Sequence, residues 1–228
     1  MKRARLGLLI SGRGSNMAAI LEAAGPDYPA EPVLVLSNRS DAAGLGFAAA
    51  KGVPTAVVES RAFKGDRAGF EAAMEAELAK HGVEIIALAG FMRVLTADFV
   101  RRWEGRLINV HPSLLPAFPG LDTHARALAA GVRLHGCTVH MVTAGVDEGP
   151  ILAQAAVPVL PGDTEAGLAA RVLAAEHQIY PAALSWLAAG RVRVEAGRAV
   201  INAAEYAPDS LLNPLPRAAL LSTKQANR

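Results

Sequence analysis

The stretch LINVHPSLLP, residues 107–116, is an apolar strand pattern that ends on polar side chains and then breaks at a proline. Asn109 and His111 are two residues apart, so in an extended chain both side chains point to the same face of a sheet. Pro112 and Pro116 prevent a helix from continuing the strand and set the backbone beyond it. In open α/β sheets, ligands bind at the carboxyl ends of the strands. The stretch therefore predicts a strand that delivers an amide and an imidazole to a binding edge.

On the N-terminal side of this strand, apolar runs alternate with alanine-rich segments of helical period. The alternation is a βαβ series, in which each helix connects two parallel strands. The sequence therefore predicts a mainly parallel sheet, with strands at residues 5–10, 33–37, 55–58, 85–89 and 107–111.

The pattern changes after Gly131. Residues 136–143 and 151–157 are strand candidates joined by a turn-rich segment, which predicts an antiparallel or mixed extension of the sheet. The expected fold class is α/β: a Rossmann-like open sheet that is mainly parallel, with a mixed or antiparallel C-terminal extension and helices on both faces.

A long helix is expected to begin near Asp163 or Thr164, with Asp163 able to cap it, and to end at Gly190. Beyond it, residues 191–195 and 199–202 are strand-like and predict a short hairpin. From residue 207 onward the composition is rich in proline, asparagine and charge without a clear period, which predicts a loosely ordered tail over residues 207–228.

Composition places the chain among globular proteins with one substantial core, because 52% of its 228 residues are hydrophobic and 19% are charged. A formal net charge of +2 excludes a basic face for nucleic acid. No stretch approaches the roughly 18 apolar residues of a membrane span, and Gly12 and Arg13 cut the first apolar run short of a signal peptide. A single cysteine, Cys137, excludes an internal disulfide and a cysteine-rich metal site. We expect a cytoplasmic protein without a nucleic-acid or membrane partner.

Residues 11–16, SGRGSN, lie between the first expected strand and the first helix. The two glycines allow a sharp turn and a close approach of the backbone to a ligand, and the helix that follows offers free N–H groups to a phosphate. The segment is neither a full dinucleotide fingerprint nor a Walker loop. Taken alone, it suits a phosphate loop and a plain strand-to-helix turn, capped by Ser15 or Asn16, about equally well.

Asp147 lies in the turn between the strand candidates that follow Gly131. A carboxylate brought beside His111 would hold the imidazole and favour its protonated form. The alternative is an exposed turn residue before Gly149 and Pro150, which would be the better interpretation of an isolated aspartate.

Together these segments resemble the folate-dependent formyltransferases, a superfamily that includes glycinamide ribonucleotide formyltransferases, methionyl-tRNA formyltransferases and formyltetrahydrofolate deformylases. INVHPSLLP at residues 108–116 resembles the superfamily signature, and HMVTAGVDEGPIL at 140–152 resembles its aspartate segment. GRGSN at 12–16 and PGLDTH at 119–124 favour the glycinamide ribonucleotide branch. The resemblance covers roughly residues 5–195.

The resemblance implies a reaction and its catalytic residues. The formyl group of 10-formyltetrahydrofolate, a co-substrate, would pass to the amine of N1-(5-phospho-D-ribosyl)glycinamide in de novo purine biosynthesis, the route to IMP. Asn109, His111 and Asp147 would be catalytic, and no metal is required. His135 and His140 occupy positions of the family pattern that do not carry proton transfer, so both are expected to be structural.

The resemblance also implies binding residues. Gly14, Ser15 and Asn16 would contact the ribonucleotide phosphate, and Glu176 its ribose hydroxyls. The folate would contact side chains or backbone of Arg67, Met92, Arg93, Val94, Leu95, Asn109 and Asp147. Asp122 stands where some relatives carry histidine, which puts a folate contact through that side chain in doubt.

The expected organisation is a single formyltransferase domain over residues 1–206. Its N-terminal half, about 1–105, would bind phosphate, and residues 106–206 would hold the folate and the catalytic groups. Two alternatives stay open: a hydrolase of the deformylase type that releases formate from the same folate, and a catalytically silent nucleotide-binding module. The sequence leaves monomer and homodimer equally open.

Overall fold

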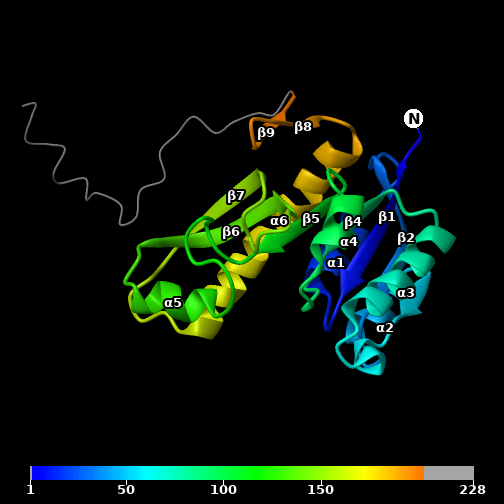
Figure 1. Cartoon of the computed structure of the whole chain (residues 1–228). Coiled ribbons are helices and arrows are strands. Elements are labelled where there is room, and N and C mark those ends of the chain that lie inside the picture. The colour runs from blue at the N-terminus through cyan, green and yellow to red at the C-terminus, as the bar shows by residue number, and fades with distance from the viewer. Residues whose placement is uncertain (1, 203–228) are drawn as a thin grey trace, which may run out of the picture.

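The computed structural model describes residues 2–202, and the expected tail at 207–228, like the last residues of the expected domain, lies outside them. Seven strands of the described chain form one sheet in the order β3-β2-β1-β4-β5-β6-β7. Figure 1 shows this sheet running through the molecule with helices on both of its faces. The predicted α/β fold class is therefore confirmed.

The first five strands are parallel, as the βαβ pattern predicts. They are β1 (Ala4–Ile10), β2 (Ala30–Ser37), β3 (Thr55–Val57), β4 (Ile85–Leu88) and β5 (Leu107–His111). Because β1 lies between β2 and β4, the strand order reverses beside β1. Ligand clefts of open α/β sheets form at such a reversal, outside the carboxyl ends of the strands.

The antiparallel extension is also confirmed. β6 (Leu134–Met141) pairs with β5, and β7 (Ile151–Pro158) pairs with β6, both antiparallel. In this register Asn109 lies opposite His140, and His111 lies opposite Thr138.

Helices cover the two faces of the sheet unequally. The larger core packs the sheet against α1 (Ser15–Ala23), α2 (Ala43–Ala50), α5 (Thr123–Ala129) and α6 (Glu165–Ala188). The smaller core packs the opposite face against α3 (Arg67–Lys80) and α4 (Ala97–Arg102), with the 3-10 helix η1 (Ser60–Phe63) beside it.

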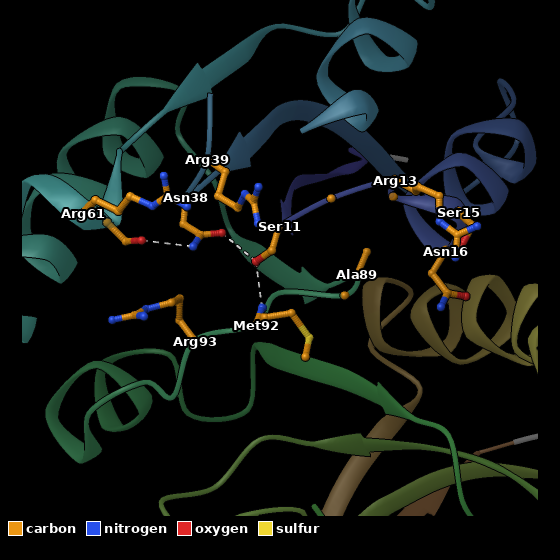
Figure 2. Close-up of a pocket in the computed structure, with 14 residues that line it drawn as sticks. Ser11, Arg13, Ser15, Asn16, Asn38, Arg39, Arg61, Ala89, Met92 and Arg93 are labelled. Carbon is orange, nitrogen blue, oxygen red and sulfur yellow. Dashed lines mark hydrogen bonds between the residues drawn. The ribbon is translucent and has the colours of Figure 1, made fainter. Parts of the chain in front are cut away.

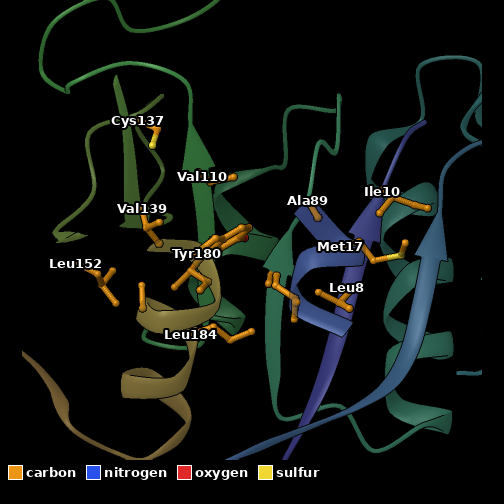
Figure 3. Close-up of a cluster of buried hydrophobic side chains, with 14 of the residues drawn as sticks. Leu8, Ile10, Met17, Ala89, Val110, Cys137, Val139, Leu152, Tyr180 and Leu184 are labelled. Atoms are coloured by element: carbon orange, nitrogen blue, oxygen red, sulfur yellow. The ribbon is translucent and has the colours of Figure 1, made fainter. Parts of the chain in front are cut away.

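Tyr180 of α6 stands in the middle of the larger core, among the side chains of Figure 3, and is fully buried. Its hydroxyl donates to the carbonyl oxygens of Leu88 at 2.9 Å and Ile108 at 3.2 Å. The hydroxyl has a single hydrogen, so the two carbonyls share it, and such a bond contributes about 1 kcal/mol in a protein interior. Tyr180 thereby fixes the ends of β4 and β5 next to the residues that the sequence assigns to the site.

The face of β5 that carries Asn109 and His111 is only partly covered by helices. Leu107, on the same face, packs into the smaller core beside α3 and α4. Further along, loops take the place of the helices: Phe118 contacts His111, and the backbone N–H of Gly120 donates to Asp147 at 2.9 Å. Polar side chains can therefore face a cleft here without being covered by apolar ones.

Two local details complete the fold. Thr164, not Asp163, caps α6, because its hydroxyl accepts from the backbone N–H of Gly167; Asp163 instead pairs with Arg171 at 2.9 Å. The predicted hairpin is present as β8 (Val192–Glu195) and β9 (Arg198–Ile201). Within residues 2–202, no helix combines the length and apolar character of a membrane span.

Candidate active site

A pocket of about 470 Å³ opens at the carboxyl ends of β1, β2 and β4, where the strand order reverses. Its wall is the SGRGSN loop, residues 11–16, and its rim carries four arginines: Arg13, Arg39, Arg61 and Arg93. Figure 2 shows Arg61 and Arg93 at one end of the pocket and Arg13 with Asn16 at the other. Arg39 is neutralised by Asp41 at 2.6 Å. The remaining guanidinium groups favour an anionic ligand.

Sequence reasoning missed Arg39 and Arg61, because isolated arginines in loops are usually solvated.

Ser11 organises the floor of this pocket. Its hydroxyl donates to Asn38 at 2.6 Å and accepts from the backbone N–H of Met92 at 2.7 Å. The amide of Asn38 in turn donates to Ser60 at 3.2 Å. These bonds connect the ends of β1, β2 and β4 with η1, so the segment that begins at Met92 is held against the SGRGSN loop.

Gly14 is the N-cap of α1 and adopts a left-handed conformation, with φ at 69°. No side chain caps this helix, so the interpretation of Ser15 or Asn16 as a cap is wrong. The free N–H groups of its first turn remain available to a ligand. A Cβ at position 14 would lie 3.2 Å from Met17 and 3.5 Å from Gly44, so the position suits glycine in both conformation and space.

Asn16 and Glu176, which are 160 residues apart, meet beside this loop. The Asn16 amide donates to the Glu176 carboxylate at 2.6 Å, and both side chains are buried. The Asn16 side-chain oxygen is buried without a hydrogen-bond partner among the described residues. Burial raises the pKa of Glu176, against the opposing effect of the Asn16 bond. Two residues that the sequence assigns to one ligand therefore lie in contact, and one of them has an unused acceptor.

At the end of β5, His111 and Asp147 are brought together as the sequence predicts. Nδ1 of His111 lies 3.3 Å from a carboxylate oxygen of Asp147, and both side chains are largely buried. Nε2 of His111 lies 3.0 Å from the carbonyl oxygen of Phe118. Both ring nitrogens thus face acceptors, which a doubly protonated imidazole satisfies at once.

The loop that carries Asp147 is held in an unusual conformation. Asp147 has φ at 56°, which non-glycine residues rarely adopt. At Gly149 a Cβ would lie 1.7 Å from the Met141 carbonyl oxygen, so only glycine fits the loop against β6. The Asp147 carboxylate also accepts from the backbone N–H of Gly120. These constraints point the carboxylate inward, which excludes the alternative of an exposed turn residue.

His140, which sequence reasoning set aside as structural, lies in the same cluster. Its Nε2 is 3.4 Å from the Asn109 amide nitrogen and 3.8 Å from Asp147, and its Nδ1 is 2.8 Å from the Met141 carbonyl oxygen. The signal that identifies it is the strand register, which places His140 opposite Asn109. His135 lies away from Asn109 and instead contacts His124 at 3.2 Å.

The residues assigned to the folate are dispersed. Met92 and Arg93 line the pocket, and Met92 and Val94 are exposed apolar side chains with relative exposures of 68% and 66%. Leu95 packs against the smaller core. Arg67 is exposed at the first turn of α3 and does not line the pocket.

The carboxyl ends of the parallel strands thus carry two chemical environments. One is a basic pocket with free helix N–H groups, which suits a phosphate. The other is an imidazole between a carboxylate and a carbonyl with an amide beside it, which suits proton transfer and the stabilisation of a developing oxyanion. Within residues 2–202, no group of His, Cys, Asp and Glu side chains forms a metal-binding cluster.

The chain is similar to a known protein family and to individual proteins with formyltransferase or purine-biosynthesis names. Residues 4–184 match the formyl transferase family. The chain is 42% identical over 202 residues to the phosphoribosylglycinamide formyltransferase of Escherichia coli (strain K12), covering 88% of this chain and 95% of that protein. It is 47% identical over 199 residues to the trifunctional purine biosynthetic protein adenosine-3 of Bos taurus, covering 86% of this chain. The alignment spans only 20% of that bovine protein.

Solved structures are similar over the same region. The crystal structure of glycinamide ribonucleotide transformylase 1 from Symbiobacterium toebii has a TM-score of 0.84 at 46% sequence identity, covering 87% of this chain and 94% of that chain. That of phosphoribosylglycinamide formyltransferase from Brucella melitensis is 55% identical with a TM-score of 0.78, covering 83% of this chain and 97% of that chain.

Proposed function

The chain belongs to the formyl transferase family, and from this membership we propose that it transfers a formyl group from 10-formyltetrahydrofolate to the amine of glycinamide ribonucleotide. The products are the N-formyl ribonucleotide and tetrahydrofolate, and the step belongs to purine biosynthesis. The observation that carries the proposal is the meeting of Asn109, His111 and Asp147 at the end of β5, beside a basic pocket at the same sheet edge.

The ribonucleotide is assigned to the SGRGSN side of the cleft. Its phosphate would accept from the free backbone N–H groups that follow Gly14, with Ser15 and Asn16 beside it. Its ribose hydroxyls would reach Glu176 and the unused side-chain oxygen of Asn16. Anchoring at both ends would orient the amine, which lowers the entropic part of the barrier.

The folate is assigned to the segment after β4, which borders the same pocket, and to the Asp147 loop. The segment from Met92 to Leu95 would receive its flat ring system, because two exposed apolar side chains, those of Met92 and Val94, lie there. Arg67 and Arg93 are the cations assigned to this co-substrate, and the Asp147 loop would close over it.

The roles of the catalytic residues follow from charge development. The amine nitrogen attacks the formyl carbon, and the formyl oxygen takes up negative charge in a tetrahedral intermediate. The Asn109 amide and the protonated His111 would stabilise that oxygen. As the bond to the folate nitrogen breaks, that nitrogen gains a proton, and the attacking amine loses one. His111 would carry these protons, directly or through water, while Asp147 keeps the ring oriented and charged.

One contact must change during this cycle. Nε2 of His111 faces the Phe118 carbonyl at 3.0 Å. The substrate would take the place of that carbonyl, so that the proton of Nε2 faces the reacting atoms. The exchange costs little, because one acceptor of a charged donor replaces another.

The experiment is a product assay with the purified chain, 10-formyltetrahydrofolate and glycinamide ribonucleotide. We expect one equivalent of N-formyl ribonucleotide for each tetrahydrofolate formed, and no formate when the ribonucleotide is left out. Stoichiometric formate without ribonucleotide would instead identify a hydrolase, and no turnover with both substrates would identify a silent binding module.

A further inference from the structure

The pair formed by Asn109 and His140 is fixed by the backbone. The two residues are directly opposite each other in the antiparallel register of β5 and β6. Residues so paired have Cβ atoms on one face of the sheet, about 5 Å apart. The side chains of Asn109 and His140 therefore lie next to each other on the same face of the sheet. The amide nitrogen of Asn109 lies 3.4 Å from Nε2 of His140.

The tautomer of His140 follows from its other nitrogen. Nδ1 lies 2.8 Å from the carbonyl oxygen of Met141, and a carbonyl can only accept, so Nδ1 carries the proton. In the neutral ring, Nε2 is then an acceptor. Burial lowers the pKa of His140, although the Met141 bond and the nearby Asp147 carboxylate act in the opposite direction. His140 is only 2% exposed, and the neutral ring is the form that this environment favours.

An acceptor at Nε2 determines which way the Asn109 amide points. An asparagine side chain has an oxygen and a nitrogen at nearly equivalent positions, and its hydrogen bonds decide between the two orientations. With Nε2 of His140 as acceptor, one amide hydrogen of Asn109 is held by the sheet. The second hydrogen of the same nitrogen is left for a ligand in the cleft.

We propose that His140 is a positioning residue for formyl transfer: its neutral imidazole holds the Asn109 amide with the nitrogen, not the oxygen, turned toward the reacting formyl oxygen. A donor there stabilises the oxyanion, whereas a flipped amide would present an oxygen to it and repel it. The same neutral ring leaves the Asp147 carboxylate, 3.8 Å away, to His111. The inference rests on the proposed function, since it assigns the purpose of the amide.

Three variants of the full-length chain separate this role from a structural one. His140→Leu keeps a buried side chain of similar size but has no acceptor. His140→Gln retains an acceptor near the position of Nε2. Val139→Ala removes a fully buried methyl pair from the opposite face of the same strand, and so destabilises β6 without touching Asn109.

Steady-state kinetics provide the first readout. We expect His140→Leu to lower kcat about 10- to 100-fold, as for a misdirected oxyanion donor, with KM for both substrates within about threefold of the parent. His140→Gln should be faster than His140→Leu. Its log kcat should lie at least about a third of the way from the leucine variant back to the parent. Val139→Ala should lower the unfolding midpoint yet keep the parent kcat within about threefold. A folded His140→Leu with parent kcat, or a glutamine variant no better than the leucine variant, would overturn the proposal.

Nitrogen-15 NMR of the ligand-free protein provides a second readout that does not depend on turnover. We expect His140 to carry its proton on Nδ1 only, and one side-chain amide hydrogen of Asn109 to exchange with water more slowly than the other. In His140→Leu that difference should disappear. A proton on Nε2 at neutral pH would overturn this inference even in an active enzyme, whereas an inactive parent with the expected tautomer would overturn the proposed function alone.

Discussion

The β1 side and the β5 side of the candidate site differ in the groups that they present. The β1 side presents backbone N–H groups, and the β5 side presents side chains. On the β1 side, a ligand would face backbone in the proposed assignment: Gly14 begins α1 with φ at 69°, and no side chain caps the helix. On the β5 side, a ligand would face side chains: Asn109, His111 and His140 project from paired strands, and Asp147 is held against them by its loop. Binding through backbone tolerates many surroundings, whereas proton transfer requires several groups in mutual contact. The SGRGSN loop of the first site is local in sequence, whereas the second site depends on the packing of three segments.

His111→Ala should show the largest effect, because in the proposed mechanism this residue both carries protons and stabilises the oxyanion. We expect kcat to fall by about 10² to 10⁴ with the fold retained. The measurement is single-turnover formyl transfer, alongside circular dichroism. His81→Ala is the control, since His81 lies at the end of α3 and its ring bonds to the carbonyl of Glu77 in that helix. A His111 variant within threefold of the parent would remove this residue from the mechanism.

Asp147→Asn keeps the shape of the side chain but removes the charge beside Nδ1 of His111. The amide can also turn its nitrogen toward a protonated ring, which then loses its acceptor. We expect kcat to fall by about 10², because the imidazole loses the carboxylate that holds it in one orientation. Asp163→Asn is the matched control: it removes a carboxylate that is also paired, but to Arg171 at the start of α6. That change should reduce stability and leave kcat unchanged.

Gly14→Val tests the backbone side of the comparison. A Cβ at φ 69° is strained and lies 3.2 Å from Met17, so the free N–H groups of α1 should shift. We expect KM for the ribonucleotide to rise about 10- to 100-fold, and KM for the folate to stay within about threefold. Gly52→Val carries the same kind of strain at φ 75° in open space away from the pocket, and should change neither constant. If folate binding is lost instead, the two substrates have been assigned to the wrong sides.

The free energy of unfolding should fall in acid because of buried histidines on the β5 side. The histidines with lowered pKa values all lie after residue 105. Burial lowers the pKa of His135 to about 4, with a further contribution from His124, and burial also lowers the pKa of His124 and His140. An unfolded histidine has a pKa near 6.5. Between these values the unfolded chain binds more protons, so stability is complete above about pH 6.5 and is lost as the pH falls toward 4.

The expected loss from His135 is about 2 to 3 kcal/mol, since a tenfold change in proton affinity between the folded and unfolded chain corresponds to about 1.4 kcal/mol. Urea unfolding at pH 7.5 and pH 4.5 measures it, and His135→Gln should flatten the difference. Equal unfolding midpoints for the parent at both pH values would contradict the assignment of a neutral buried His135.

A chelator should have the smallest effect. The proposed chemistry uses only Asn109, His111 and Asp147, so we expect turnover after dialysis against EDTA to stay within about 20% of the untreated rate, well below the tenfold change that corresponds to 1.4 kcal/mol. A loss that zinc or magnesium restores would require a metal in the mechanism.

Local patterns in the sequence were sufficient for the elements and for half of the site. The βαβ alternation predicts the five parallel strands, and the position of SGRGSN between a strand and a helix predicts the pocket wall. What local patterns cannot contain is pairing between distant segments. The bond between Asn16 and Glu176 and the pairing of Asn109 with His140 depend on helix packing and strand register. The sequence also predicts Asp163 as the cap of α6, whereas Arg171, two turns into the helix, engages that carboxylate and Thr164 is the cap.

One calorimetric comparison tests most directly whether substrate binding and catalysis belong to different sides of the site. Glycinamide ribonucleotide is titrated into the parent, His111→Ala and Gly14→Val, with no folate present. If backbone on the β1 side binds the substrate and side chains on the β5 side transform it, the His111 variant should bind with an affinity within about threefold of the parent, while the Gly14 variant should bind at least about tenfold more weakly. Equal losses in both variants, or a loss confined to His111→Ala, would contradict the account.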